Sequence, residues 1–185
     1  LIYPTQFSDK ERNVRLEGEA FFDVAHKEHL PFVVHSPLLA IKVLGTKFNF
    51  RDYPDDAEAI VSLSEGKVAL NNLLKKEKEA FLLPNERVVL NKKNGRMHVE
   101  YSTVSNALQW TNGYLFFDEE LLPDVVKELE RSYNVKIQIA SDTLNTFRFY
   151  GNFVHREQNI QEVLEALSAT RKIHYIIEGH NITLY

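Results

Sequence analysis

Cysteine is absent from the 185 residues, which excludes a disulfide framework and thiol chemistry. No apolar run approaches the roughly 20 residues that a membrane-spanning helix needs, and no signal-peptide pattern is present. Glycine and proline are sparse, at seven and six residues, whereas twelve Phe and eight Tyr favour an aromatic-rich core. Because the sequence opens on Leu1 rather than Met, we interpret it as a piece of a longer protein whose targeting segments precede it.

Positive charge is scarce in one half of the chain. Residues 1–105 contain 15 Lys and Arg against 15 Asp and Glu, which gives a net charge of zero. Residues 106–185 contain 7 against 11, so the whole net charge of −4 arises there. A nucleic-acid surface requires a basic patch, so we expect no nucleic-acid partner.

Motifs for catalysis and metal binding are missing as well. The sequence has no GxSxG, GxGxxG, Walker or HExxH motif. His26 and His29 lie in a polar loop, and the acidic segment 52–58 lacks the ligand spacing of an EF-hand loop. We interpret both as solvated loops rather than metal sites. The chain is therefore not expected to be an enzyme, and no catalytic residue, metal or cofactor is predicted.

The first hundred residues show the alternating apolar positions that are typical of strands. We predict an all-β N-terminal domain over residues 1–105, built as stacked sheets, a sandwich or a short solenoid. The segment "NKKNG" separates two alternating runs, and Asn94-Gly95 favours a type I′ hairpin turn there.

Three glycines mark the places where this alternation changes phase. Apolar residues are odd-numbered in 41–43 and even-numbered in 48–50, with Gly45 between them. The same change occurs across Gly66 and across Gly95. Because a straight strand keeps one phase, we predict that Gly45, Gly66 and Gly95 are structural corners where glycine supplies a positive φ.

Residues 106–185 carry a different pattern, in which strand–helix–strand segments occur twice, at 114–140 and 149–178. Their apolar positions match at one offset of 38 residues: Leu122/Ile160, Val125/Val163, Leu129/Leu167, Val135/Ile173 and Ile137/Tyr175. We predict a second, small α+β domain of two repeated βαβ-type units, closed by a final strand at 180–185.

Three acidic residues precede the first helix of this domain. Asp118, Glu119 and Glu120 include the residue types of a general acid/base pair. Their position before Pro123, a residue suited to a first helical turn, favours a role at the helix N-terminus instead.

The segment "FRFYGNF" at 147–153 has more aromatic residues than one buried face of a small sheet requires. Tyr and Arg are enriched where surfaces bind partners. We predict that Arg148, Phe149 and Tyr150 contribute to a partner-binding edge. The alternative is an inner strand whose aromatic side chains pack under the helices.

Several segments, in this order, resemble the FecR family of sigma-factor regulators. In the first domain they are "GEAFFDV", "KVLGTKFN" and "EGKV". In the second domain "LERSYNVKI" and "YGNFVHREQNIQEVLEAL" resemble the C-terminal domain of Bacteroidetes-type anti-sigma factors. That domain is in turn similar to the periplasmic signalling domain of TonB-dependent outer-membrane transporters.

The resemblance implies a periplasmic sensor half of an inner-membrane protein with one transmembrane helix. Its expected partner is the periplasmic signalling domain of a TonB-dependent transporter, and we expect the signal to pass on as a change in protease access to the juxtamembrane chain. The sigma factor would be bound only through a cytoplasmic segment that this sequence lacks. The family has no catalytic residues, so none is carried over.

Two other classes remain open from the sequence. A carbohydrate-binding β-domain of the cell envelope would need an exposed aromatic platform, and Trp110, the single Trp, falls in the expected linker rather than on a strand. A hydrolase would need two titratable groups that converge in a cleft.

Overall fold

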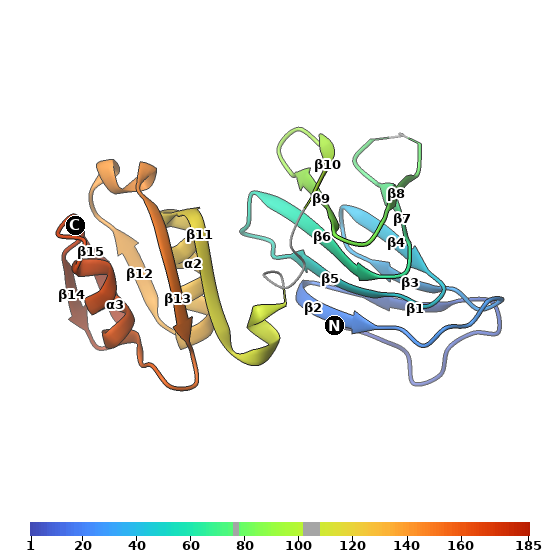
Figure 1. Cartoon of the computed structure of the whole chain (residues 1–185), viewed down its shortest axis with the longest axis horizontal. Coiled ribbons are helices and arrows are strands. Elements are labelled where there is room, and N and C mark those ends of the chain that lie inside the picture. Colours follow the sequence, from blue (N-terminus) through green and yellow to red (C-terminus); the bar gives the residue numbers. More distant parts are fainter. Residues whose placement is uncertain (76–77, 102–107) are drawn as a thin grey trace. The chain divides into compact units, whose positions relative to one another are not determined.

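The computed structural model describes residues 1–75, 78–101 and 108–185. The chain divides into two compact units, residues 1–108 and 109–185 (Figure 1). The predicted domain boundary after residue 105 lies outside the described residues. Among the described residues, no helix is long and apolar enough to cross a membrane.

The first unit consists of two stacked sheets of five strands each among the described residues, and their pairs are antiparallel except β1 with β3. One sheet has the order β1 (Arg12–Arg15), β3 (Phe32–His35), β4 (Leu39–Val43), β7 (Val68–Asn72), β8 (Ala80–Leu82). The other has the order β10 (Met97–Tyr101), β9 (Glu86–Asn91), β6 (Glu58–Glu65), β5 (Lys47–Asp52), β2 (Gly18–Asp23).

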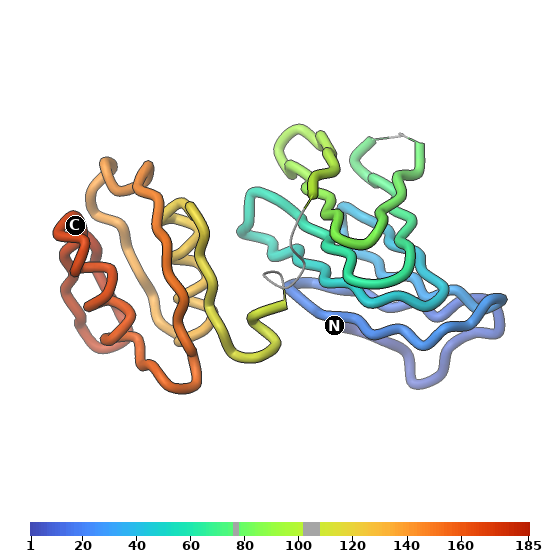
Figure 2. The backbone as a smooth tube through the Cα atoms, viewed as in Figure 1, coloured from blue at the N-terminus to red at the C-terminus, as the bar shows by residue number. Residues whose placement is uncertain are grey.

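The change of phase at Gly45 has a simple cause in this arrangement. The chain leaves β4 in one sheet and enters β5 in the other, so the two strands face each other across one core. Ile41 and Phe48 are both fully buried in that core. Gly66 lies at the reverse crossing, from β6 to β7. The path of the backbone through this unit can be followed in Figure 2.

The reason for glycine differs between these two crossings. Gly66 has a φ of +93°, as predicted. Gly45 does not have a positive φ, so that part of the prediction is wrong. A Cβ at Gly45 would lie 2.6 Å from the Cα of His26, and this close backbone approach is what requires glycine there.

Gly95 lies in the hairpin loop between β9 and β10, within one sheet. Its φ is +66°, but Asn94 has no positive φ, so the predicted type I′ turn is wrong. The Asn91 side chain instead accepts hydrogen bonds from the amides of Lys93 and Asn94, and Gly95 N–H donates to the Asn91 carbonyl at 2.8 Å. This four-residue loop needs only one left-handed residue.

The second unit contains two small sheets and two α-helices among its described residues. In chain order its elements are η1 (Gln109–Asn112), β11 (Tyr114–Leu121), α2 (Leu122–Tyr133), β12 (Lys136–Ile139), η2 (Asp142–Thr146), β13 (Arg148–Val154), α3 (Ile160–Ser168), β14 (Tyr175–Glu178), β15 (Asn181–Leu184). β11 pairs with β13, and the second sheet has the order β12-β15-β14.

Both helices bury the apolar stripe that their sequences predicted. Val125 and Leu129 of α2 are fully buried, and so are Val163 and Leu167 of α3, 38 residues later. They share one core with both small sheets. The structure therefore confirms the predicted fold class, an all-β domain of stacked sheets followed by a small α+β domain in which strand–helix–strand occurs twice.

Candidate functional site

The strand β13 has one buried face and one exposed face. Phe149 and Phe153 are buried in the core, whereas Arg148 and Tyr150 are exposed. Of the three residues predicted to contact a partner, Arg148 and Tyr150 thus lie on a surface. Phe149 does not, because it packs inside the unit beside Phe117 and is only 6% exposed.

A glycine allows the two buried rings of β13 to stack. The Phe149 and Phe153 rings are 6.1 Å apart and nearly parallel, at 3°. Gly151 lies between them on the same face, and a Cβ there would come within 2.5 Å of the Phe149 ring. The aromatic residues of this strand therefore lie on two faces: the Phe149 and Phe153 rings are in the core, and Tyr150 is on the surface.

A β-bulge in β11 holds the exposed side chains of β13. The register between the strands shifts between Phe117 and Glu120, and Glu119 has a φ of +55°. Arg148 Nη1 donates a hydrogen bond to the Glu119 carbonyl, and Tyr150 Oη donates one to the Glu119 carboxylate. A bulge commonly redirects side chains in this way.

This placement corrects the predicted role of the acidic residues. Asp118, Glu119 and Glu120 belong to the strand, and the N-cap of α2 is Leu121, which makes no side-chain capping bond. The first amide of the helix instead donates to the Phe147 carbonyl at 2.8 Å. Pro123 does lie in the first turn, as predicted.

The environment of Tyr150 raises the pKa of its phenol. The largest cause is the hydrogen bond to the Glu119 carboxylate, followed by partial desolvation and by the negative charges of Glu119 and Asp118. The Arg148 guanidinium acts in the opposite direction. The raised pKa favours the protonated phenol, which is the form that can donate the hydrogen bond to Glu119.

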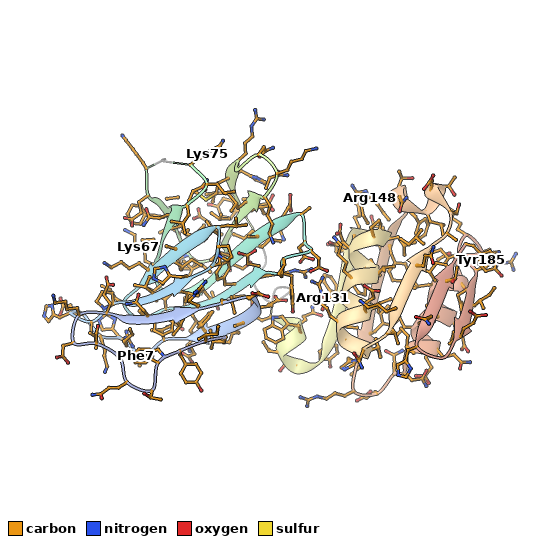
Figure 3. The ribbon with its side chains drawn as sticks, turned by 180° about the vertical axis from the view of Figure 1, so that it is seen from behind. Phe7, Lys67, Lys75, Arg131, Arg148 and Tyr185 are labelled. Carbon is orange, nitrogen blue, oxygen red and sulfur yellow. The ribbon has the colours of Figure 1, made fainter. Side chains whose placement is uncertain are left out.

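A surface pocket adjoins this site. Residues from η2, from the start of β13 and from the turn after α3 line it: Thr143, Leu144, Thr146, Phe147, Arg148 and Lys172. The Lys172 ammonium lies 5.6 Å from the centre of the Phe147 ring. Figure 3 labels Arg148, which begins β13 directly after η2.

The sequence analysis missed most of this site. Arg148 and Tyr150 were identified by residue type, but the bulge at Glu119 and the pocket residues Thr143 and Lys172 were not. No local pattern marks a bulge inside an eight-residue strand. The pocket joins segments that are about 25 residues apart in sequence, so only the fold brings them together.

The candidate metal sites have ordinary environments. Among the described residues, no three His, Cys, Asp or Glu side chains gather as a metal-binding group. In the acidic loop 52–58, Asp52 pairs with Lys92 at 2.7 Å and Asp56 pairs with Arg51 at 2.9 Å. Two carboxylates of that loop are thus engaged by cations.

Trp110 lies in the short 3-10 helix η1 and is 40% exposed. It does not lie on a strand face, where a sugar-binding platform would be built. A flat sheet face lined by several aromatic side chains is what stacking on a sugar ring would require.

Two family models match the chain, one for each unit. The model described as "FecR protein" matches residues 1–69, and the model described as "FecR, C-terminal" matches residues 114–184. Together they leave out mainly the end of the sandwich and the segment that connects the units. No curated protein sequence matches the chain significantly.

Solved structures agree with these matches. Two crystal structures of a protein assigned as an anti-sigma factor from Parabacteroides distasonis ATCC 8503 have TM-scores of 0.89 and 0.88 to this chain. Both are 33% identical, and the match covers 99% of this chain and 84% of theirs. With this identity over most of both chains, and with both family models in the expected order, the chain belongs to the FecR family of anti-sigma factors.

Proposed function

We propose that this chain is the periplasmic sensor half of a membrane-anchored sigma-factor regulator, and that it receives its signal from a TonB-dependent outer-membrane transporter by docking of protein domains. In this role the α+β unit carries the docking surface, and the sandwich is the structural domain that holds that surface at a distance from the membrane. The sigma factor is bound by a cytoplasmic segment outside the present sequence.

The observation that carries this proposal is the exposed site on β13 in the unit that matches the FecR C-terminal model. Arg148 and Tyr150 are exposed yet held in place by the bulge at Glu119. Side chains that are fixed before binding lose less conformational entropy when a partner docks. Tyr and Arg are also the residue types that most often dominate protein–protein binding energy.

A strand edge beside these residues supports the same role. β13 pairs with β11, and no other described strand pairs with β13. Its outer edge therefore offers backbone groups to which a partner strand can add. The sandwich lacks such a short two-stranded sheet, because each described sheet there has five strands.

Signal transfer requires that the partner distinguish two states of the regulator. A transporter domain that binds both states equally shifts nothing, however tightly it binds. The proposal therefore predicts that the ligand-loaded and ligand-free transporter domains bind this chain with different affinities.

The proposal is tested by calorimetric titration of the chain with the periplasmic signalling domain of the transporter encoded beside its gene. We expect saturable binding of one domain per chain, weakened by Tyr150→Ala and Arg148→Ala when the circular dichroism spectrum is unchanged. Lys136→Ala, on an exposed side chain of the same unit, serves as the control. Absence of binding to every such domain would contradict the proposal, and retention of an oligosaccharide would favour the carbohydrate-binding alternative.

A further inference from the structure

The pocket between η2, β13 and the turn after α3 combines two cations with an apolar floor. Arg148 and Lys172 supply the charges, and Leu144 and Phe147 supply the apolar surface. Leu144 is buried beneath it, whereas both cations are exposed. Such a lining fits a ligand that has a carboxylate at the end of an aliphatic stem.

Neither cation forms an ion pair with a carboxylate among the described residues. Arg148 donates to a backbone carbonyl, and Lys172 lies over an aromatic ring. Arg156 and Arg171 likewise have no ion pair among the described residues, whereas the other three cations of this unit do. Lys127, Arg131 and Lys136 lie 3.1, 3.8 and 3.9 Å from the carboxylates of Asp124, Glu128 and Glu130.

Cations without a carboxylate partner are unexpected in this unit, because it contains more acidic than basic residues. Residues 109–185 contain the same 7 basic and 11 acidic residues as the segment 106–185, because residues 106–108 are uncharged. In a region with four more acids than bases, carboxylate partners are abundant. Two cations that line one pocket without such a partner therefore leave room for a carboxylate from outside.

The Arg148 side chain and the backbone of Lys172 are both restrained before any ligand binds. The Glu119 carbonyl, turned outward by the bulge, accepts from Arg148 Nη1. The backbone amide of Lys172 donates to Thr170 Oγ1, directly after Arg171, which has a φ of +57°. Positive φ is costly for a residue other than glycine or asparagine, and it fixes the direction in which the chain leaves α3.

We propose that this pocket binds an acidic side chain on a segment of the docking partner; this inference rests on the proposed function. A negatively charged unit repels an extended polyanion such as an anionic membrane surface or a nucleic acid. A single carboxylate that enters the pocket meets two cations locally and avoids most of that repulsion. The proposal therefore commits to a protein segment with Asp or Glu beside an apolar residue.

The first test uses an acetylated, amidated Gly-Leu-Glu-Gly peptide, which has one carboxylate beside one apolar side chain, with the ¹⁵N-labelled chain at low ionic strength, because salt screens exposed charges. We expect amide shifts confined to residues 143–148 and 171–173. Arg148→Glu and Lys172→Glu should each weaken binding about tenfold, whereas Lys172→Arg should retain it. Lys136→Glu changes the net charge by the same amount and should weaken binding less than about twofold.

Three results would overturn the inference. The peptide could cause no localised shifts, or Lys136→Glu could weaken binding as much as the pocket variants do. Alternatively, vesicles of phosphatidylglycerol could bind in a pocket-dependent manner while the peptide does not, which would identify a membrane surface as the ligand.

The second test separates this inference from the proposed function. The transporter signalling domain is titrated against the wild-type chain and the same charge-reversal variants. Unchanged binding to Lys172→Glu, together with weakened binding to Arg148→Glu, would reject the pocket and leave the proposed docking site on β13 intact. Failure of every transporter domain to bind the wild-type chain would reject the proposed function itself, whatever the peptide does.

Discussion

The two units of this chain differ in net charge, although both contain cations with and without a carboxylate partner among the described residues. In the sandwich, which has no net charge, several cations are matched by carboxylates: Lys47 with Asp23 and Glu65, Arg51 with Asp56, Arg87 with Glu100, and Lys92 with Asp52. In the α+β unit, with its excess of four acids, Arg148 and Lys172 line a pocket without such a partner. The sandwich also contains cations without a carboxylate among the described residues, such as Lys67, which lies over the Phe81 ring. In the α+β unit two such cations line one pocket beside apolar side chains, and this arrangement suits the proposed docking surface.

The two units also differ in the size of their sheets. The described sheets of the sandwich have five strands each, whereas the α+β unit has one sheet of two strands and one of three. A two-stranded sheet is stable only when something packs on it, and here buried side chains of β11 and β13 share a core with both helices. The short sheet thus keeps an accessible edge without losing stability.

The largest effect is expected when a buried side chain in the core of one unit is truncated and the unfolding of the other unit is measured. Phe48→Ala should lower the free energy of unfolding of the sandwich by about 3–5 kcal/mol, and Leu129→Ala should lower that of the α+β unit by about 2–5 kcal/mol, since both side chains are fully buried. Trp110, the single Trp of the chain, belongs to the second unit, so its fluorescence follows the unfolding of that unit. We expect the unfolding midpoint measured by Trp110 fluorescence to fall in Leu129→Ala and to remain unchanged in Phe48→Ala.

If both variants shift the Trp110 transition equally, the units unfold as one cooperative body. The description of two separately stabilised units would then be wrong. Circular dichroism at the helical minimum provides a second reading, because both described α-helices belong to the second unit.

A smaller effect is expected from one glycine in each unit. Gly45→Ala and Gly151→Ala should each destabilise by about 1–3 kcal/mol, because the new Cβ would lie 2.6 Å from His26 and 2.5 Å from the Phe149 ring. Gly179→Ala is the control: its φ is +64° but no atom lies within 4 Å of the new Cβ, so a cost of about 1 kcal/mol is expected. Chemical denaturation measures all three.

The outcome at Gly45 distinguishes crowding from backbone conformation. Should Gly45→Ala cost less than Gly179→Ala, the approach of His26 would not be the reason for glycine at that crossing.

The two helix starts in the second unit give the next prediction. Asn159 caps α3 in a capping box, with its side chain accepting from the Glu162 amide at 3.1 Å and the Glu162 carboxylate accepting from the Asn159 amide at 2.8 Å. Asn159→Ala should therefore cost about 1 kcal/mol. Asp118→Ala should change the stability by less than about 0.5 kcal/mol, because Asp118 lies in a strand and does not cap α2. Thermal unfolding of both variants checks this difference.

The smallest effect concerns the phenol of Tyr150. Glu119→Gln removes the main cause of its raised pKa, so the pKa should move down toward the ordinary tyrosine value. A raised pKa in the folded state means that the contribution of this group to stability is present below the ordinary tyrosine pKa and is lost as the pH rises through the folded value. NMR of the Tyr150 ring carbon over alkaline pH measures the shift. An unchanged pKa in Glu119→Gln would mean that the two side chains are not bonded in solution.

The sequence predicted the parts of the fold that depend on periodic burial. The phase changes at Gly45 and Gly66 located two of the crossings between the stacked sheets, from β4 to β5 and from β6 to β7, because alternation records which face of a strand is buried. The stripes ending at Leu129 and Leu167 likewise located both helices. These signals are local and repeat over several residues.

Other features were invisible because they depend on the register between distant strands. The bulge at Glu119 arises from pairing with β13, about 30 residues away, and it turned the expected helix cap into part of a strand. Phe149 was assigned to the surface because residue type cannot show which of two faces is buried. The pocket that joins Thr143 to Lys172 needed the complete fold.

Hydrogen–deuterium exchange of the chain, alone and with the transporter signalling domain, tests the central proposal most directly. The account predicts slower exchange in peptides that cover residues 141–154 and 170–173, with the sandwich unchanged. Protection confined to the sandwich, or no protection anywhere at saturating partner, would contradict the assignment of the α+β unit as the docking surface.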